Sequence, residues 1–81
     1  MRVPRDLSAT ELVVAARRYG YVVTRQKGSH LRLTSTMNGE HHITIPNHSA
    51  LRLGTLNAII TDIATHFRHT KEEVCEKLFG S

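Results

Sequence analysis

Residues 21–46 decide the fold, and their sequence is YVVTRQKGSHLRLTSTMNGEHHITIP. Three short segments in this stretch alternate apolar and polar side chains or are rich in β-branched residues, which is typical of β-strands. The three segments are residues 21–26, 30–36 and 41–46. Turn residues separate them, with Lys27-Gly28-Ser29 at one junction and Asn38-Gly39 at the other. The stretch therefore predicts three antiparallel strands that follow one another in a meander.

The segment before the strands predicts a helix. Ser8 and Glu11 have the spacing of a capping box, in which each side chain bonds to the backbone N–H of the other residue. Apolar residues then recur at helical intervals over residues 9–18, and Gly20 is placed to end the helix.

Two further helices are predicted after the strands. Residues 55–67 carry apolar side chains on one helical face, so we expect this helix to cover the sheet, with Gly54 and Thr55 at its start. A second capping box begins at Thr70 and opens a short helix that Gly80 ends. The sequence therefore predicts an α+β fold, in which a three-stranded antiparallel sheet has helices on one face. The expected order is α-β-β-β-α, plus a short C-terminal helix.

The length of the chain limits the size of its core, and its charge limits the kind of partner it binds. At 81 residues and 40% hydrophobic content, there is room for one small core, so we expect a single domain over residues 1–81. Lys and Arg total 11 against 7 acidic residues, and the resulting net charge of +4 favours a polyanionic partner. The one cysteine, Cys75, excludes an intramolecular disulfide, and no apolar run approaches membrane-spanning length. We therefore expect a cytoplasmic protein with no membrane partner.

Side-chain alternation assigns the two faces of the predicted sheet. Leu31 and Leu33 share one face of the second strand, and Ile43 and Ile45 share one face of the third, so these faces belong to the core. The opposite face is polar. It carries His30, Arg32, Thr34 and Thr36 from the second strand, with His42 and Thr44 from the third.

The hexapeptide at residues 25–30 places an imidazole beside basic side chains. Histidine titrates near neutral pH, so His30 is a plausible group for acid–base chemistry on a phosphodiester, and Gly28 lets backbone amides approach an anion. The alternative is an ordinary basic hairpin turn, because Lys-Gly-Ser is a common sequence in turns. For Arg25, solvation of the turn and contact with a phosphate both remain open.

Three groups of residues, in this order, resemble the HicA family of small toxins from toxin–antitoxin pairs. They are RQKGSH at residues 25–30, HITIP at 42–46 and LGTL at 53–56, within a resemblance that spans roughly residues 8–67. The resemblance implies a fold like the double-stranded RNA-binding domain. It also implies an endoribonuclease that cleaves mRNA and is silenced by a HicB-like antitoxin. The histidine of the Gly-Ser-His motif, here His30, would be the catalytic group, and Gly28 would let the backbone turn near the substrate.

RNA supplies its own nucleophile, the 2′-hydroxyl, so cleavage of the adjacent phosphodiester needs a base, an acid and charge neutralisation. We therefore expect no metal and no cofactor. We expect His30 to accept the 2′-hydroxyl proton or to protonate the leaving 5′-oxygen, while Lys27 and Arg32 balance charge on the phosphate. The products would be a 2′,3′-cyclic phosphate and a 5′-hydroxyl.

Several neighbours complete the predicted site. The expected RNA-binding residues are Lys27, Gly28, Ser29, Arg32 and His42. One histidine cannot fill both proton-transfer roles, so a second group is needed. The first candidate is His42, which faces outward on the neighbouring strand, and the second is His48.

The other histidines and the cysteine have simpler interpretations. His41 falls on the apolar side of its strand, where packing or hydrogen bonding is expected. His66 and His69 are three residues apart, as helical metal ligands can be, but they straddle the end of a predicted helix and no recognised ligand motif surrounds them. Cys75 is interpreted as a small residue on a helix face and not as a nucleophile.

Two other functions remain open on the sequence. A noncatalytic RNA-binding module would use the same basic sheet for phosphate and 2′-hydroxyl contacts. The basic surface could also serve mainly to dock an acidic partner protein through charge complementarity, in which case association would depend strongly on salt. Cleavage that is lost in His30→Gln while RNA binding persists would favour the enzyme over the binding module.

Overall fold

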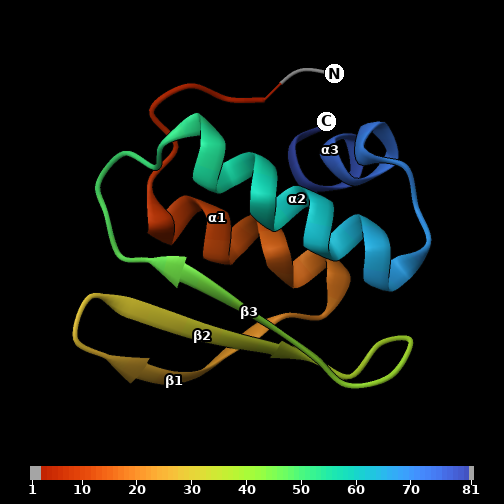
Figure 1. Ribbon diagram of the computed structural model, residues 1–81, viewed down its shortest axis with the longest axis horizontal. Helices are drawn as coiled ribbons and strands as arrows, with labels where there is room; N and C mark the ends of the chain where they lie inside the picture. The colour runs from red at the N-terminus through yellow and green to blue at the C-terminus, as the bar shows by residue number, and fades with distance from the viewer. Residues whose placement is uncertain (1–2, 81) are drawn as a thin grey trace.

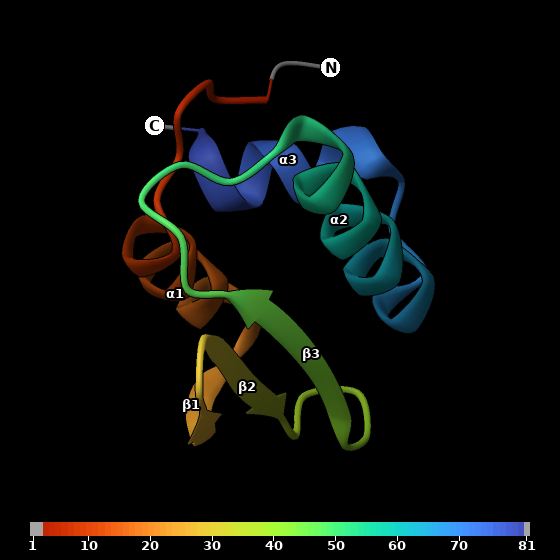
Figure 2. The ribbon, with the colours of Figure 1, turned by 60° about the vertical axis from the view of Figure 1, so that its left-hand side comes forward.

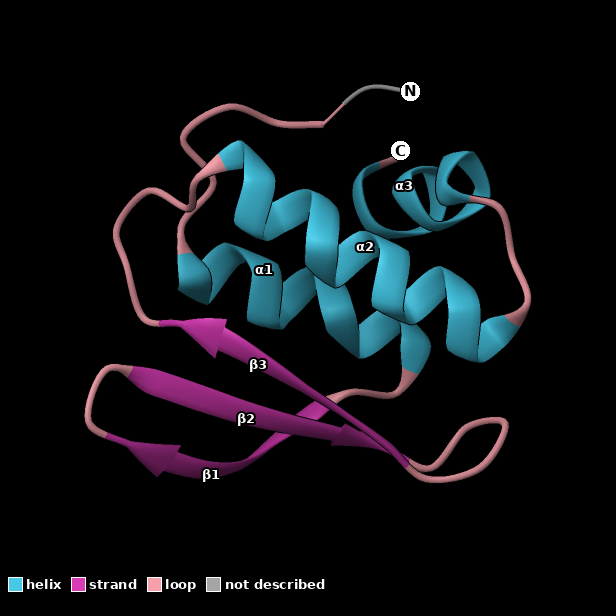
Figure 3. Ribbon diagram, in the orientation of Figure 1, coloured by secondary structure: helices cyan, strands magenta, loops and turns pink. Residues whose placement is uncertain are grey.

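The computed structural model describes residues 3–80 and confirms the predicted α+β fold, which resembles the double-stranded RNA-binding domain. Figure 1 shows the elements in chain order, and Figure 3 separates helices from strands by colour. The elements are α1 (Ala9–Ala16), a 3-10 turn η1 (Arg17–Tyr19), β1 (Val22–Lys27), β2 (His30–Ser35), β3 (His41–Pro46), α2 (Leu53–Phe67) and α3 (Lys71–Phe79). The single domain predicted for residues 1–81 includes residues 1, 2 and 81, which lie outside the described part.

The strands of the described chain form one antiparallel sheet in the order β1-β2-β3. Helices α1 and α2 cover one face of this sheet, and α3 packs on these helices at the side away from the sheet (Figure 2). None of the helices in residues 3–80 lies over the other sheet face. The predicted arrangement, with helices on one face of the sheet, is therefore confirmed.

The core lies between the sheet and the helices, with residues of α1, α2 and α3 in one cluster. The inward residues of β2 and β3 are Leu31, Leu33, Ile43 and Ile45, and each is buried, as their alternation predicted. The apolar stripe of α2 packs over them, because Leu56, Ile59, Ile60 and Ile63 recur at helical spacing and are buried as well. The uncovered sheet face therefore receives the alternate, polar side chains of the same strands.

Two boundaries near the first helix differ from the prediction. The α-helix ends at Ala16 and tightens into the 3-10 turn, instead of continuing as α-helix over residues 9–18. The backbone N–H of Tyr21 bonds to the carbonyl of Ala16, so it closes the helix end and does not join the strand ladder. Strand β1 therefore begins at Val22 and not at Tyr21, whose side chain is buried. Gly20 ends the turn as predicted, in a left-handed conformation with φ of 82°.

The start of α2 also differs from the prediction. The helix begins at Leu53, one residue before the expected Gly54 and Thr55, and Arg52 occupies the N-cap position. Arg52 has extended backbone angles and its carbonyl accepts the first helical hydrogen bond, from Leu56. No side chain caps this end, so the sequence lacks the capping residue by which such a start is recognised.

Candidate active site

The turn between β1 and β2 places Lys27 directly opposite His30. The two residues are Cα partners in the strand register, and Gly28 and Ser29 form the two-residue loop between them. Gly28 has φ of 56°, which L side chains rarely adopt, and glycine at the first position is typical of one tight hairpin turn. Apart from its two chain neighbours, no residue of the described chain has an atom within 4 Å of a Cβ built on Gly28, so this loop borders open space. The glycine is therefore needed for the turn conformation and leaves room beside it.

A β-bulge at Thr24 turns the basic side chains of β1 outward. Val23 pairs with Leu33 on the inner face, whereas Arg25 pairs with Arg32 on the outer face, and the register shifts between Val23 and Arg25. Strict alternation from Val23 would carry Arg25 to the inner face, beneath the helices. The extra residue reverses this alternation. As a result Arg25 and Lys27 lie on the same outer face as His30.

These side chains surround a shallow cavity of about 190 Å³ on the open sheet face. Its lining residues are Arg25, Lys27, His30, Arg32 and Thr44. The volume is smaller than the roughly 300–1,000 Å³ of a pocket for a small organic ligand. A phosphate with the neighbouring ribose oxygens is an anion of suitable size for this cavity.

The cations at the cavity have no acidic partner among residues 3–80. The acidic side chains that contact a basic group in that part of the chain are Asp62, which contacts His41, and Glu40, which contacts His42. Arg25 and Arg32 are opposite each other in the register, and like charges placed this way destabilise a sheet. An arrangement that costs stability but brings positive charge together is typical of a site that receives an anion.

The structure does not place His42 beside His30. In the register His42 is opposite Thr34, and Thr34 is four residues from His30, which corresponds to roughly 13 Å along the strand. The ring of His42 is also engaged at both nitrogens, because Nδ1 lies 2.8 Å from the Thr34 hydroxyl and Nε2 lies 2.9 Å from Glu40 Oε2. His42 therefore belongs to a separate polar patch on the same face, and its contact with RNA stays a prediction.

That patch is a hydrogen-bonded chain across all three strands. The hydroxyls of Thr24 and Thr34 lie 2.8 Å apart, and Thr34 continues the chain to His42 and from there to Glu40. Because the Glu40 carboxylate can only accept, Nε2 of His42 donates to it. The chain fixes the His42 ring at a distance from the cationic cavity.

His48, the other candidate for the second proton-transfer group, lies in the loop after β3. This loop passes close to the β1–β2 turn, since the backbone N–H of Asn47 donates to the carbonyl of Ser29 at 2.6 Å. The carbonyl of His48 accepts from Ala9 at the start of α1, so the loop then turns toward the helices. His48 is exposed, but its side chain does not line the cavity.

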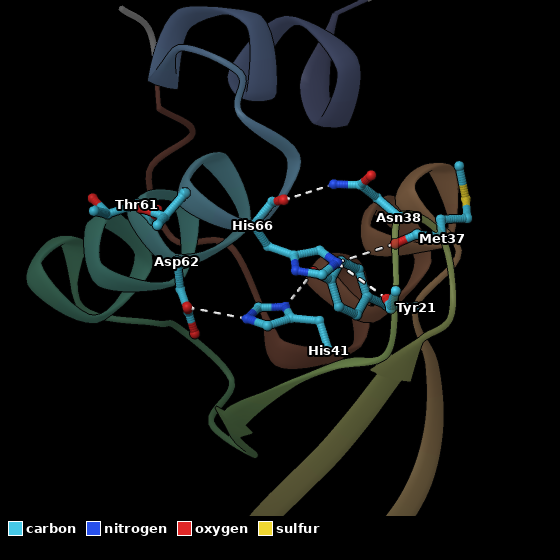
Figure 4. Close-up of polar contacts among 9 residues, drawn as sticks. Tyr21, Met37, Asn38, His41, Thr61, Asp62 and His66 are labelled. Carbon is cyan, nitrogen blue, oxygen red and sulfur yellow. Dashed lines mark hydrogen bonds and ion pairs between the residues drawn. The ribbon is translucent and has the colours of Figure 1, made fainter.

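A pair of histidines, His41 and His66, lies on the opposite, helical side of the sheet (Figure 4). The rings of His41 and His66 stack with centroids 4.3 Å apart and planes 9° from parallel. His41 binds the Tyr21 hydroxyl through Nδ1 and the Asp62 carboxylate through Nε2. Burial raises the pKa of the Tyr21 hydroxyl, and the Asp62 charge adds to the shift. The hydrogen-bonding role predicted for His41 is therefore confirmed.

His66 fastens the loop between β2 and β3 to helix α2. Its Nε2 donates toward the carbonyls of Met37 and Gly39, at 3.1 and 3.2 Å, and its own carbonyl accepts from the Asn38 side chain (Figure 4). His69 contacts a different partner, the Tyr19 hydroxyl, 2.8 Å from Nδ1. His66 and His69 thus hold separate parts of the structure. In residues 3–80, no three His, Cys, Asp or Glu side chains converge on a point where a metal ion could sit.

Cys75 is a packing residue, as the sequence predicted. It lies buried on α3, and burial raises the pKa of its thiol, which disfavours the reactive thiolate.

The structure brings together four of the residues that sequence analysis placed on the polar face or its turn. These are Lys27, His30, Arg32 and Thr44. It also settles the position of Arg25, for which the sequence left two interpretations open, by placing it at the cavity. A bulge has no dependable pattern in a single sequence, so strand alternation alone could not have assigned Arg25 to this face.

These observations define a class of protein: a small α+β domain whose uncovered sheet face carries an exposed histidine among unpaired cations. A family model described as the HicA toxin of bacterial toxin–antitoxin systems matches residues 9–64, which is 56 of the 81 residues. The chain therefore belongs to the HicA toxin family. In the same comparisons no curated protein and no solved structure matched the chain. Among the described helices, none combines the length and the apolar character needed to cross a membrane.

Proposed function

We propose that this HicA-family chain is an endoribonuclease that cleaves mRNA without a metal, using His30 as its catalytic acid or base. The observation that carries the proposal is the position of His30 at a cavity lined by Arg25, Lys27 and Arg32, on the sheet face that none of the described helices covers. Such a face is open to a polynucleotide, and its cations can stabilise the charge that develops on a phosphate during attack.

The proposed reaction uses the 2′-hydroxyl of the substrate as nucleophile. His30 accepts its proton, the 2′-oxygen attacks phosphorus, and the 5′-oxygen leaves, so the products are a 2′,3′-cyclic phosphate and a 5′-hydroxyl. Lys27, Gly28, Ser29 and Arg32 bind the RNA at the turn and cavity. His42 binds it farther along the same face.

Membership of the HicA family implies a cognate antitoxin. We propose that this partner is HicB-like, and that it silences the toxin by covering the cationic cavity with acidic side chains. The cluster of cations without acidic partners in residues 3–80 favours such a partner through charge complementarity. The proposed place of action is the cytoplasm, where mRNA and an antitoxin of this kind would both be present.

The test is cleavage of a defined RNA by purified wild type and His30→Ala, with the ends of the products mapped. Removal of a general acid or base lowers the rate by roughly 10²–10⁴-fold, so we expect His30→Ala to be slower by at least 100-fold. Wild-type cleavage should be unchanged by a chelator, and the same sequence as DNA should stay intact because it has no 2′-hydroxyl. His69→Ala is the matched control, because His69 is exposed and lies away from the cavity.

Three results would contradict the proposal. Undiminished cleavage by His30→Ala would remove His30 from the reaction, and loss of cleavage with chelator would show a metal requirement. RNA that is bound but never cleaved by the wild type would identify a noncatalytic RNA-binding module.

A further inference from the structure

The proposed reaction needs a proton donor for the leaving 5′-oxygen, and His30 cannot fill this role while it is the base. We propose that Lys27 is that donor, so that the catalytic pair is a histidine and a lysine instead of two histidines. This inference rests on the proposed ribonuclease function and adds an assignment for its second catalytic residue.

The strand register places Lys27 where the donor must be. Lys27 and His30 are direct partners across the tight turn, and the Cβ atoms of such partners are roughly 5 Å apart on the same face. Both side chains line the cavity, and both residues are exposed. The lysine side chain is flexible, so its ammonium can reach the far side of a phosphate whose 2′-oxygen faces His30. The imidazole of His30 and the ammonium of Lys27 can thus contact one phosphate from two sides.

The other residues at the cavity cannot donate this proton. The guanidinium groups of Arg25 and Arg32 stay protonated in proteins, so they neutralise charge without giving up a proton. The hydroxyl of Thr44 is no stronger an acid than the ribose hydroxyl that leaves. An ammonium group is a stronger acid than that hydroxyl, so transfer from lysine to the departing oxygen is favourable.

The two histidine candidates are absent from the cavity lining. His42 is on β3, opposite Thr34, which lies four residues along β2 from His30. The two ring nitrogens of His42 bond to Thr34 and Glu40. The main chain of His48 is tied to the start of α1. Among residues 3–80, Lys27 is therefore the lining group, besides His30, that can give a proton to the substrate.

The step balances as an internal transesterification. The bond between phosphorus and the 2′-oxygen forms as the bond between phosphorus and the 5′-oxygen breaks. His30 takes the proton of the 2′-hydroxyl and becomes an imidazolium, while the Lys27 ammonium gives a proton to the 5′-oxygen and becomes a neutral amine. Transfer of one proton from the imidazolium to the amine, through water, then restores both groups.

The experiment must separate proton donation from charge neutralisation, since a lysine can do both. An RNA with sulfur in place of the bridging 5′-oxygen provides this separation, because a thiolate leaves readily without a proton. We expect Lys27→Ala to cleave ordinary RNA at least 100-fold more slowly than wild type. The sulfur-containing RNA should remove most but not all of this defect, because the variant also loses the positive charge of Lys27. Lys27→Arg keeps the charge without the transferable proton, so it should be at least 100-fold slower than wild type on ordinary RNA and within about fivefold of wild type on the sulfur-containing RNA.

Two variants serve as comparisons. His30→Ala should be slow on both substrates, because the sulfur substitution leaves the need for a base unchanged. Arg32→Ala should also be slow on both, because charge on the phosphate develops in either reaction. Lys27 is exposed, so its variants should have the thermal unfolding midpoint of the wild type, and circular dichroism checks this.

The possible outcomes separate this inference from the ribonuclease proposal. Rescue of Lys27→Ala by the sulfur substrate supports the assignment. Wild-type rates for Lys27→Arg on ordinary RNA, or equal slowing of Lys27→Ala on both substrates, would overturn it while leaving the ribonuclease intact. A wild type that cleaves neither RNA would overturn both.

Discussion

The six histidines of this chain differ in what their rings contact, and this difference separates the catalytic candidate from the structural ones. His41, His42, His66 and His69 each form ring hydrogen bonds within the described structure. The rings of His30 and His48 form none among residues 3–80, and His30 alone of these two lines the cationic cavity. A ring without internal partners can exchange protons with a substrate, and the sequence could not reveal which rings these would be.

Ser35 shows how a single polar side chain can hold a turn. It is fully buried, its hydroxyl donates to the carbonyl of Tyr19 at 2.6 Å, and it accepts from the backbone N–H of Met37 at 3.1 Å. We expect Ser35→Ala to lower the free energy of unfolding by about 1–3 kcal/mol, because it leaves the buried carbonyl without a partner. Urea denaturation followed by circular dichroism measures this change.

The neighbouring Thr36→Ala is the matched control for Ser35, since Thr36 is exposed and its side chain makes no hydrogen bond among residues 3–80. Its effect should stay within about 0.5 kcal/mol. Equal effects of the two substitutions would mean that the Ser35 hydrogen bonds contribute nothing to the stability of this turn.

Among the strands, β1 departs most from a simple alternation of buried and exposed side chains. Alternation assigned the faces of β2 and β3 correctly, because their apolar residues pack against α2 at every second position. Every residue of β1 is exposed, so burial marks no preferred face in its sequence. The bulge at Thr24, where the register with β2 shifts, then decides where Arg25 and Lys27 point. The sequence therefore predicted side-chain orientation correctly in β2 and β3, where burial sets the alternation. It left the orientation of Arg25 undecided, because burial sets no alternation in β1.

The capping box of α3 makes a pH-dependent contribution to stability. Hydrogen bonds from the Thr70 backbone and side chain lower the pKa of Glu73 below its ordinary value of 4.5. The folded state therefore favours the ionised carboxylate, so the contribution is complete above pH 4.5 and is lost as the pH falls through the lowered folded pKa. We expect the stability difference between wild type and Glu73→Gln to be constant near neutral pH and to change only below pH 4.5. Thermal unfolding across pH 2–7 measures it.

Glu72→Gln is the control for this titration, because Glu72 lies in the same helical turn and accepts no hydrogen bond in the described structure. The difference between this variant and wild type should depend less on pH than the difference for Glu73→Gln. The same pH profile for both variants would assign the effect to overall charge and not to the capping box.

At the scale of the whole molecule, α3 extends the fold beyond the residues that match the family model. The match ends at residue 64, yet α3 buries Val74 and Leu78 in the shared core. The guanidinium of Arg18 also donates to carbonyls near the end of α3, including that of Lys77 at 3.0 Å. The role of this helix in activity was open on the sequence, whereas its role in packing is plain from these contacts.

We expect a chain that ends at His69 to lose much of its stability. Burial of Val74 and Leu78 contributes roughly 1.5–3 kcal/mol each, and domains have only about 5–15 kcal/mol in total. The unfolding midpoint should fall by more than about 10 °C, which circular dichroism measures. Leu78→Ala should cause a smaller fall, and Lys71→Ala, at an exposed position, almost none. A truncated chain with the wild-type midpoint would mean that α3 only rests on a core that is complete without it.

The sequence by itself determined the order and type of the elements, the inner faces of β2 and β3, the two capping boxes and the family. Each of these depends on local periodicity, on short motifs or on their order along the chain. Only the tertiary structure decided that Arg25 joins the cavity, that His42 lies apart from His30, and that His41 stacks on His66. These relations depend on strand register and on the packing of a helix against a sheet. Both arise from contacts between separate elements of the chain, which the periodicity within one element does not encode.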